Sequence, residues 1–410
     1  MAKVYSKALD QTLEVDRYIG RLEGTLPGPS VVFTAGMHGN EPSGVFALRR
    51  MLDWLQANAV PLRGKVYALA GNLWALQRQE RYHRQDLNRL WTVGRIQRLQ
   101  QGQLLAEDED ARQQQALWGC LQQILQQDKG PFYFMDLHTT SCETIPFLLL
   151  NDSLLNRRFT AQYPLPMILG IEEYLEGPLL SYINELGYVA FGFEAGQHDD
   201  LSSIENHQAF SMLSLVFAGC LKGGDIPFAH YWGILAKHTR GVSDFWEIFF
   251  RYRIREGEQF AMVPGYVNFQ KVHKGQQLAS SNGRPIRADR TARVFMPLYQ
   301  SQGSEGFFAI RKVAPVFLRL SAAMRRLGMD KLLPLLPGIR WIGPARDALR
   351  VDHRLARLYS RDLFHLLGYR SKRLKGRPVG SGRPAGRAHY ILRNREAASR
   401  DAEYREADWY

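Results

Sequence analysis

One short stretch, from Val31 to Gly44, constrains this chain more than any other part of its sequence. It consists of VVFTAGMHGNEPSG, so three β-forming residues lead into a glycine-rich turn, and a proline follows where a helix would begin. The turn carries His38 and Glu41 in the spacing H-x-x-E. Imidazole and carboxylate groups bind Zn²⁺, and a catalytic zinc needs a third protein ligand and an open position for water. The stretch therefore predicts a strand, a turn with two metal ligands and a helix, although this spacing also occurs by chance.

Strands and helices alternate through the first half of the chain. Runs of β-forming residues predict strands, and apolar residues at helical spacing predict helices at 42–58, 175–186 and 202–220. The predicted strands are 31–35, 65–70, 132–136, 147–150, 167–169 and 188–193. Such alternation is typical of an α/β domain with a largely parallel or mixed sheet, in which ligands bind beyond the carboxyl ends of the strands. Polar side chains just beyond strand ends are therefore the candidate site residues.

His138 is the candidate third metal ligand. It follows the strand that ends at Asp136, as His38 follows an earlier strand, so both histidines are expected at one edge of the sheet. His38, Glu41 and His138 would leave a position for water, whose pKa a bound Zn²⁺ lowers to roughly neutral. Asp136 is a candidate carboxylate for orienting a ligating histidine.

Glu194 and an arginine-rich loop offer the remaining chemistry. Glu194 follows the strand at 188–193, and a partly desolvated carboxylate beside a metal can take a proton from water and pass it to a leaving amine. A helix N-cap or an ordinary surface acid is the alternative. Arg81, Asn88 and Arg89 form a second cluster, in which guanidinium groups can hold a carboxylate or stabilise an oxyanion. A solvated basic loop is the alternative there.

Composition favours a cytoplasmic protein. Three widely spaced cysteines in 410 residues argue against a disulfide framework and suit a reducing compartment. The first 20 residues lack the apolar core of a signal peptide, and no uncharged apolar stretch is long enough to span a bilayer.

The net charge of +13 belongs to the C-terminal part of the chain. Residues 313–410 hold 21 Lys and Arg against 9 Asp and Glu, whereas the first 312 residues hold 32 against 31. Short strand-like runs between Gly-rich turns at 245–312 predict a small antiparallel β-domain. The predicted domains are an α/β domain at 1–235, a β-domain at 236–312 and a basic, Leu/Arg-rich extension at 313–410, helical at first and then partly disordered.

The basic extension has more than one interpretation. Leu, Phe and Met interleave with Arg from Phe317 to Trp341, which suits an amphipathic helix on an anionic membrane surface. The Arg-, Gly- and Pro-rich end that follows could contact nucleic-acid phosphates non-specifically. A helix packed on the body of the protein, followed by a solvated tail, is the alternative.

The sequence contains GMHGNEPSG, RYHRQDLNRLW, MDLHTTS and GFEAGQH in this order. Together these motifs resemble the succinylglutamate desuccinylase/aspartoacylase family of zinc amidohydrolases, which is related to the zinc carboxypeptidases. The later MVPGYVNFQKVHKGQQLA and FMPLYQSQGSEGFF resemble the C-terminal β-domain of that family, so the resemblance covers about residues 5–312. The implied fold is a carboxypeptidase-like three-layer α/β/α sandwich with a mixed sheet and a β-domain over the site.

The resemblance also implies roles for individual residues. His38, Glu41 and His138 would bind one Zn²⁺ per chain. Glu194 would be the carboxylate that shuttles protons, and Arg81 would polarise the scissile carbonyl.

The implied substrate contacts match only in part. Asn88 and Arg89 match the pair that holds a substrate carboxylate, and Tyr299 in MPLYQ matches a tyrosine that contacts the substrate from the β-domain. Family members that act on acylated aspartate use a further arginine about ten residues before the catalytic glutamate. Asn184 stands at that distance here, with no arginine near it, so the resemblance does not extend to this substrate.

The sequence predicts a zinc-dependent hydrolase of carbon–nitrogen bonds other than peptide bonds. Its substrate would be a small N-acyl amino acid or a similar carboxylate-bearing amide, cleaved by metal-activated water with Glu194 as general base and acid. A zinc carboxypeptidase that acts on a peptide or a cell-wall stem is the alternative, and a wide cleft would favour it. The oligomeric state stays open, with a homodimer as one option.

Overall fold

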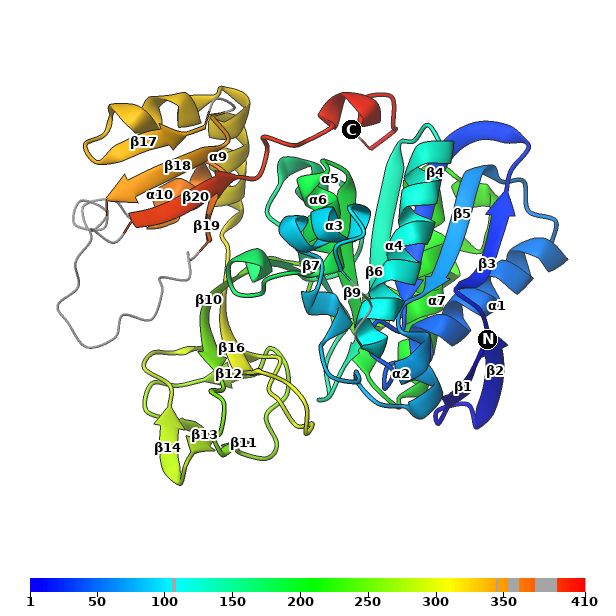
Figure 1. The fold of residues 1–410 in the computed structure, drawn as a ribbon, viewed down its shortest axis with the longest axis horizontal. Coiled ribbons are helices and arrows are strands. Elements are labelled where there is room, and N and C mark those ends of the chain that lie inside the picture. The colour runs from blue at the N-terminus through cyan, green and yellow to red at the C-terminus, as the bar shows by residue number, and fades with distance from the viewer. Residues whose placement is uncertain (105–107, 344–345, 353–360, 373–388, 410) are drawn as a thin grey trace.

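The computed structural model describes residues 1–104, 108–343, 346–352, 361–372 and 389–409. Within these residues, the largest sheet has eleven strands in the order β12-β15-β16-β10-β8-β7-β9-β6-β4-β5-β3 (Figure 1). At its centre β4 runs parallel to β5 and β6, and β6 runs parallel to β9. The strands are β3 Tyr18–Glu23, β4 Leu26–Ala35, β5 Arg63–Ala70, β6 Phe132–Thr140, β7 Phe147–Leu150, β8 Met167–Leu169, β9 Val189–Gln197, β10 Phe245–Arg253, β12 Lys271–Val272, β15 Ala292–Phe295 and β16 Glu305–Lys312.

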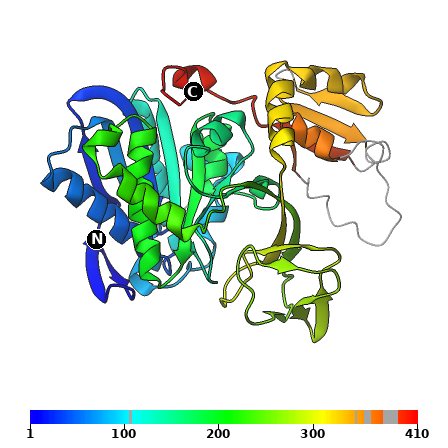
Figure 2. The ribbon, with the colours of Figure 1, turned by 180° about the vertical axis from the view of Figure 1, so that it is seen from behind.

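Helices cover both faces of this sheet and make the predicted three-layer α/β/α sandwich. The helices are α1 Ser43–Ala57, α2 Leu73–Arg78, α3 Val93–Gln100, α4 Glu109–Gln127, α5 Leu154–Thr160, α6 Leu179–Glu185, α7 Leu201–Phe217 and α8 Phe228–His238. Because strand side chains alternate between faces, Tyr133 and Met135 join one core with α1 and α7, whereas Phe132 and Phe134 join the other with α4 and α6. Figure 1 shows α4 in front of the sheet, and the reverse view in Figure 2 shows the blue α1 and green α7.

Residues 245–312 extend the main sheet. β10 pairs in parallel with β8 and antiparallel with β16, so Trp246 and Phe308 share a core with Phe147 of β7. A separate antiparallel sheet lies beyond them, formed by β11 Phe260–Met262, β13 Gln277–Ser281 and β14 Arg284–Arg287. The N-terminal residues form a hairpin of β1 Ala2–Ser6 and β2 Gln11–Val15. The domain boundary at residue 235 stays a prediction.

The basic extension is partly helical, as predicted, but its helix ends early and a sheet follows. Gly328, at φ +63°, takes the left-handed conformation that commonly ends a helix, and Pro334 and Pro337 follow. The prediction of helix up to Trp341 is therefore wrong beyond Arg326. The elements are α9 Pro315–Arg326, the 3₁₀ segment η4 Met329–Leu335, α10 Arg361–Leu366, and the antiparallel strands β17 Ile339–Ile342, β18 Ala348–Asp352, β20 His389–Asn394 and β19 Tyr369–Lys372. Most of the predicted disordered end, at 373–388, lies outside the described residues.

A buried charge network joins the extension to the main sheet. Arg370 donates to Glu247 at 2.9 Å, and Arg325 donates to the Asp152 carboxylate at 3.1 Å. His365 Nδ1 lies 2.6 Å from Glu247. Burial opposes the charge of Asp152, but Arg157, Arg325 and Arg370 outweigh it and hold the pKa of this carboxyl well below its usual range. The basic charge of the extension is thus partly neutralised by Glu247 of β10 and by Asp152, which follows β7.

The last described residues return to the main sheet, where Figure 1 shows them as the red segment near the C label. Tyr404 is buried in the 3₁₀ turn Asp401–Tyr404. Its hydroxyl donates to the carbonyl oxygen of Phe132 at 2.5 Å and accepts from the N–H of Val189 at 3.0 Å. Tyr404 therefore joins the first residues of β6 and β9.

Replacing this hydroxyl tests how strongly the C-terminal segment supports the fold. Tyr404→Phe is expected to lower the free energy of unfolding by about 1–3 kcal/mol, because the buried N–H of Val189 loses its acceptor. Urea unfolding measures the change. Tyr5→Phe is the matched control, since the Tyr5 hydroxyl bonds to Asp10 in an exposed hairpin, and it should change stability by less than about 0.5 kcal/mol. Equal stability of the two variants would contradict the role of Tyr404.

Candidate active site

The turn after β4 has the backbone that its glycines permit. Gly36 has φ +68°, a left-handed conformation that glycine adopts readily. A Cβ atom on Gly39 would lie 2.0 Å from the backbone of Ala75, so a larger residue would push the turn off α2. The Glu41 N–H donates to the His38 carbonyl at 3.2 Å, which folds the turn back on itself. This geometry directs the side chains of His38 and Glu41 to the same point.

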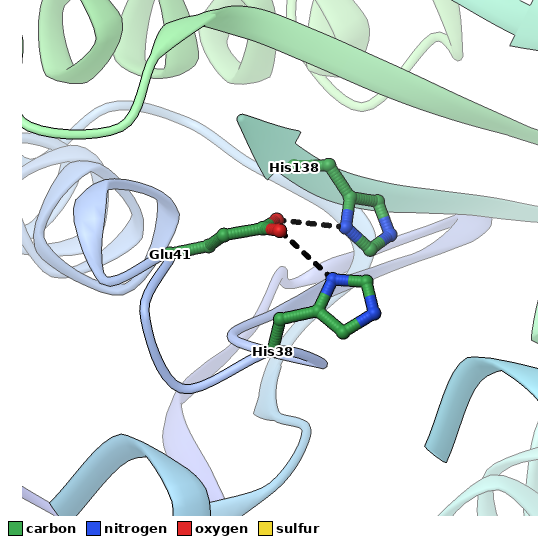
Figure 3. Close-up of side chains that lie close together, drawn as sticks. All are labelled: His38, Glu41 and His138. Carbon is green, nitrogen blue, oxygen red and sulfur yellow. Dashed lines mark hydrogen bonds and ion pairs between the residues drawn. The ribbon is translucent and has the colours of Figure 1, made fainter. Parts of the chain in front are cut away.

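His38, Glu41 and His138 lie together, and all three are buried (Figure 3). The Nδ1 atoms of His38 and His138 lie 2.8 and 3.0 Å from the two carboxylate oxygens of Glu41. Each residue offers one ligand atom, and the three atoms fall within 4.8 Å of one another. The structure thus brings together the three predicted metal ligands from β4's turn and β6.

A second carboxylate lies behind each histidine. His38 Nε2 is 3.0 Å from Asp86, and His138 Nε2 is 2.7 Å from Asp136. Because a carboxylate accepts hydrogen bonds, Nε2 is the natural site of the ring proton, and a neutral imidazole then presents the lone pair of Nδ1 toward Glu41. Burial opposes a charge on His138, but Asp136 and Glu41 outweigh it and raise the His138 pKa well above its usual value. Either a ring proton or a metal cation therefore has to lie between each ring and the Glu41 carboxylate. The donor set therefore fits a metal ion.

The sequence predicted Asp136 in this role but missed Asp86. Asp86 lies two residues before Asn88 in the same motif, and this position is the only feature of the sequence that could have marked it as a site residue. Burial opposes the charge of Asp86, but His38, Arg89 and Arg81 outweigh it and hold its pKa well below the usual range. Burial likewise opposes the charge of Glu41, and the two imidazoles keep the Glu41 pKa well below its ordinary value.

Glu194 lies beside this cluster because of strand register. It is paired with His138 across β6 and β9. The side chain is buried, and its Oε2 has no hydrogen-bond partner among the described residues. Burial raises the pKa of Glu194 to about 8, and the positive charges of His138 and Arg81 offset only part of this effect. A carboxyl group with such a pKa can both accept and donate a proton near neutral pH.

The three predicted loop residues line the same cavity. Arg81 Nη1 donates to Glu41 at 3.2 Å. Asn88 accepts from the Leu179 N–H at 2.9 Å and extends its amide nitrogen to 3.3 Å from His138 Nε2. Arg89 donates to the carbonyl of Asn88 at 2.9 Å. This loop is therefore a packed part of the site, and the alternative of a solvated basic loop does not hold.

The cavity around these residues has a volume of about 140 Å³. Arg81 and Arg89 are its only Lys or Arg side chains among the described residues. Its apolar side chains, which we call the apolar wall, are Leu149, Ile171, Leu175, Pro178, Leu180, Met296, Pro297, Leu298 and Phe308, and polar side chains such as Asn151, Ser181 and Glu305 also line the cavity. The cavity therefore combines a cationic end, a metal-type cluster and an apolar wall.

His198 also lines the cavity and was not predicted as a site residue. Its Nδ1 lies 2.8 Å from the Thr139 hydroxyl, and its Nε2 lies 3.4 Å from Gln300. It is the last residue of the motif GFEAGQH, four residues after Glu194, and this proximity is the feature of the sequence that could have marked it as a site residue. Burial lowers the pKa of His198, so the ring is neutral and can accept or donate one hydrogen bond.

Two positions singled out in the sequence lie away from the cavity wall. The Tyr299 hydroxyl donates to the Val263 carbonyl and accepts from the Tyr266 N–H, each at 2.9 Å, while its neighbours Leu298 and Gln300 line the cavity. The predicted substrate contact by Tyr299 has no support in this arrangement. Asn184 donates to the Tyr188 carbonyl at 3.0 Å and is absent from the cavity lining.

Parts of the chain are similar to known proteins. Residues 27–217 match the succinylglutamate desuccinylase/aspartoacylase catalytic domain. Over these residues the chain is similar to the catalytic domain of that family. Succinylglutamate desuccinylase of Pseudomonas aeruginosa is 38% identical over 64 residues, which are 16% of this chain and 19% of the relative. The chain thus matches about a fifth of the length of this curated relative.

Solved structures of the family have the same fold. A succinylglutamate desuccinylase/aspartoacylase from Rhodobacter sphaeroides aligns with a TM-score of 0.54 and 15% identity, over 76% of this chain and 94% of that one. Succinylglutamate desuccinylase from Chromobacterium violaceum aligns with a TM-score of 0.51 and 15% identity, over 72% and 88%. The α/β sandwich and its extended mixed sheet are therefore those of the family.

The outer carboxylates offer a test of the metal cluster. Asp136→Asn is expected to weaken Zn²⁺ binding about 10- to 100-fold, because an amide no longer orients and polarises the His138 ring. Asp86→Asn should act in the same direction through His38. Competition with a chromogenic chelator measures the affinity. Asp128→Asn is the control, since Asp128 accepts from Ser30 and Tyr67 at the opposite end of the sheet. Unchanged affinity in both site variants would contradict the proposed ring orientation.

Proposed function

We propose that this chain is a zinc-dependent amidohydrolase that removes the acyl group from a small N-acyl amino acid or a similar carboxylate-bearing amide. The observation that carries the proposal is the buried oxygen of Glu194, which has no hydrogen-bond partner among the residues that the structure describes, beside the His38–Glu41–His138 cluster. Similarity of residues 27–217 to a catalytic domain named for desuccinylase and aspartoacylase activity supports a deacylase.

The donor set supports zinc as the metal. Two histidines and one glutamate form a ligand set that catalytic zinc uses, and the carboxylates behind both rings are typical of such sites. A Zn²⁺ ion held there would polarise the scissile carbonyl and make a water molecule more acidic.

The side chains around the cluster would then carry out the proton transfers. Glu194 accepts a proton from the attacking water and returns it to the nitrogen of the leaving amine. Arg81 stabilises the negative charge that develops on the carbonyl oxygen. Arg89, with Asn88 beside it, holds the substrate carboxylate, which fixes the amide near Glu194.

The shape of the cavity favours a small substrate over a peptide. The loop 296–300 contributes Met296, Pro297, Leu298 and Gln300 to the cavity wall, and Asn40 donates to Gln300 at 3.1 Å. This contact ties the loop to the turn that carries the metal ligands. A peptidase needs an open cleft for the chain on both sides of the scissile bond, so the carboxypeptidase alternative is less well supported.

None of the described helices is long and apolar enough to cross a bilayer.

Glu194 provides the first test of this mechanism. Glu194→Gln is expected to lower kcat by about 100- to 10,000-fold, because an amide cannot accept the proton. The bound zinc content should not change, since Glu194 is not a ligand. A panel of N-acyl amino acids supplies the substrate, and Glu205→Gln on the exposed side of α7 is the control. Full activity of Glu194→Gln would rule out this mechanism.

The apolar wall predicts which substrates are preferred. An N-acyl amino acid with one carboxylate should have a kcat/KM at least about tenfold above that of N-acetylaspartate, because a second carboxylate would lose its hydration without finding a cation. Leu180→Arg introduces a cation into this wall and should bring the kcat/KM values of the two substrates closer together. Steady-state kinetics on the two substrates gives both ratios. A wild-type preference for N-acetylaspartate would contradict the assignment of the apolar wall.

A further inference from the structure

The surface of α9 and η4 carries an unusual concentration of exposed apolar side chains. Among the described residues, seven of the thirteen large hydrophobic side chains that are exposed fall within residues 316–335. We call these seven the apolar ridge; its members are Val316, Phe317, Leu320, Leu327, Met329, Leu332 and Leu335. The most exposed are Leu327 at 77% and Leu335 at 80%. Exposed apolar side chains gathered on one segment in this way usually mark an interaction site.

The ridge faces outward because the opposite side of the segment is anchored. Leu318 packs against the main core, and Leu333 belongs to the core of the C-terminal sheet. Ser321 donates to the Leu366 carbonyl at 2.8 Å, and Arg325 donates to the Asp152 carbonyl at 3.0 Å. These contacts fix the rotation of α9, so the ridge cannot turn inward to bury itself.

Positive charge accompanies the ridge. Residues 311–340 contain seven Lys and Arg but one acid, Asp330. The Asp330 carboxylate accepts from the Tyr369 hydroxyl at 3.2 Å, so it is turned toward the C-terminal sheet. Arg319, Arg326 and Lys331 are exposed between the apolar side chains. The surface is therefore apolar and cationic at once.

We propose that the apolar ridge docks on an anionic lipid surface. Leu, Val, Met and Phe side chains would enter the boundary between headgroups and acyl chains, while Arg319, Arg326 and Lys331 contact the anionic headgroups. This is a property of the C-terminal extension, and it goes beyond the proposed deacylase function.

Two other occupants fit the ridge less well. A symmetric dimer would place the same patch on both subunits, so the three cations of one copy would face those of the other. A nucleic acid would neutralise the cations but leave the leucines against a hydrated phosphate backbone, where they gain nothing. A lipid surface satisfies both the charge and the apolar area.

Vesicle co-sedimentation of the full chain tests the proposal, since the C-terminal segment is built into the main sheet through Tyr404. Wild-type protein is expected to bind vesicles of phosphatidylcholine with phosphatidylserine, and to bind less as salt rises. The ridge variant Leu327→Glu, Leu332→Glu, Leu335→Glu should bind at least about tenfold less. The variant Arg319→Gln, Arg326→Gln, Lys331→Gln should lose about a hundredfold on these vesicles, with little change on pure phosphatidylcholine.

A matched control carries the same change at exposed apolar positions elsewhere. Leu26→Glu, Val93→Glu, Leu201→Glu should bind vesicles as the wild type does. No binding by wild type at low salt, or equal binding by the ridge variant, would overturn the proposal. So would a wild-type dimer in light scattering that the ridge variant dissociates without any vesicle binding, or ridge-dependent binding of duplex DNA in place of vesicles. The readout does not involve catalysis, so its failure leaves the deacylase proposal unaffected.

Discussion

The parallel pairing of β4, β6 and β9 is the constraint on which the site depends. Backbone hydrogen bonds pair Ala35 with Leu137, and His138 with Glu194, so the ends of three strands meet at one edge of the sheet. Because side chains alternate along a strand, a slip of one residue would send Glu194 to the opposite face of the sheet. The two apolar cores oppose such a slip, since it would also move Phe191 and Phe193 out of the core they share with α1 and α7. Packing on the opposite face of β9 thus sets the distance between Glu194 and the His38–Glu41–His138 cluster.

Much of this arrangement could be predicted because its signals are local. His38, His138 and Glu194 each lie within three residues of a strongly β-forming run, so locating the strands located the edge at which they meet. Asp86 and His198 have no such signal. Each owes its place to a neighbour that is distant in sequence, His38 for Asp86 and Thr139 for His198. Strand ends can be recognised from composition, whereas the distant partners of loop side chains cannot.

The extension shows the same limit more strongly. Its Leu/Arg composition favours a helix followed by a solvated basic tail, yet Arg325 and Arg370 are 8% and 2% exposed. Their burial depends on Asp152, which follows β7, and on Glu247 of β10, and nothing in the sequence marks either acid for this role. The strand β18 pairs with β20, from Ala348↔Arg393 to Asp352↔His389. No local sequence pattern predicts this pairing. The number of charged residues therefore predicted the positive charge of the extension but not the acidic residues that pair with it.

The hydrogen bond between Tyr404 and Phe132 spans 272 positions of the chain. On a ribosome, β4, β6 and β9 emerge and can pair long before Tyr404 is made, since domains generally fold as units from the N-terminus during synthesis. Until then, the carbonyl of Phe132 at the start of β6 and the N–H of Val189 at the start of β9 lack their native partner, the Tyr404 hydroxyl. During synthesis, β4, β6 and β9 can therefore pair before Tyr404 makes its two hydrogen bonds. The growing chain passes through a stage in which the sheet edge with His38, His138 and Glu194 has formed but the opposite ends of β6 and β9 are not yet joined by Tyr404.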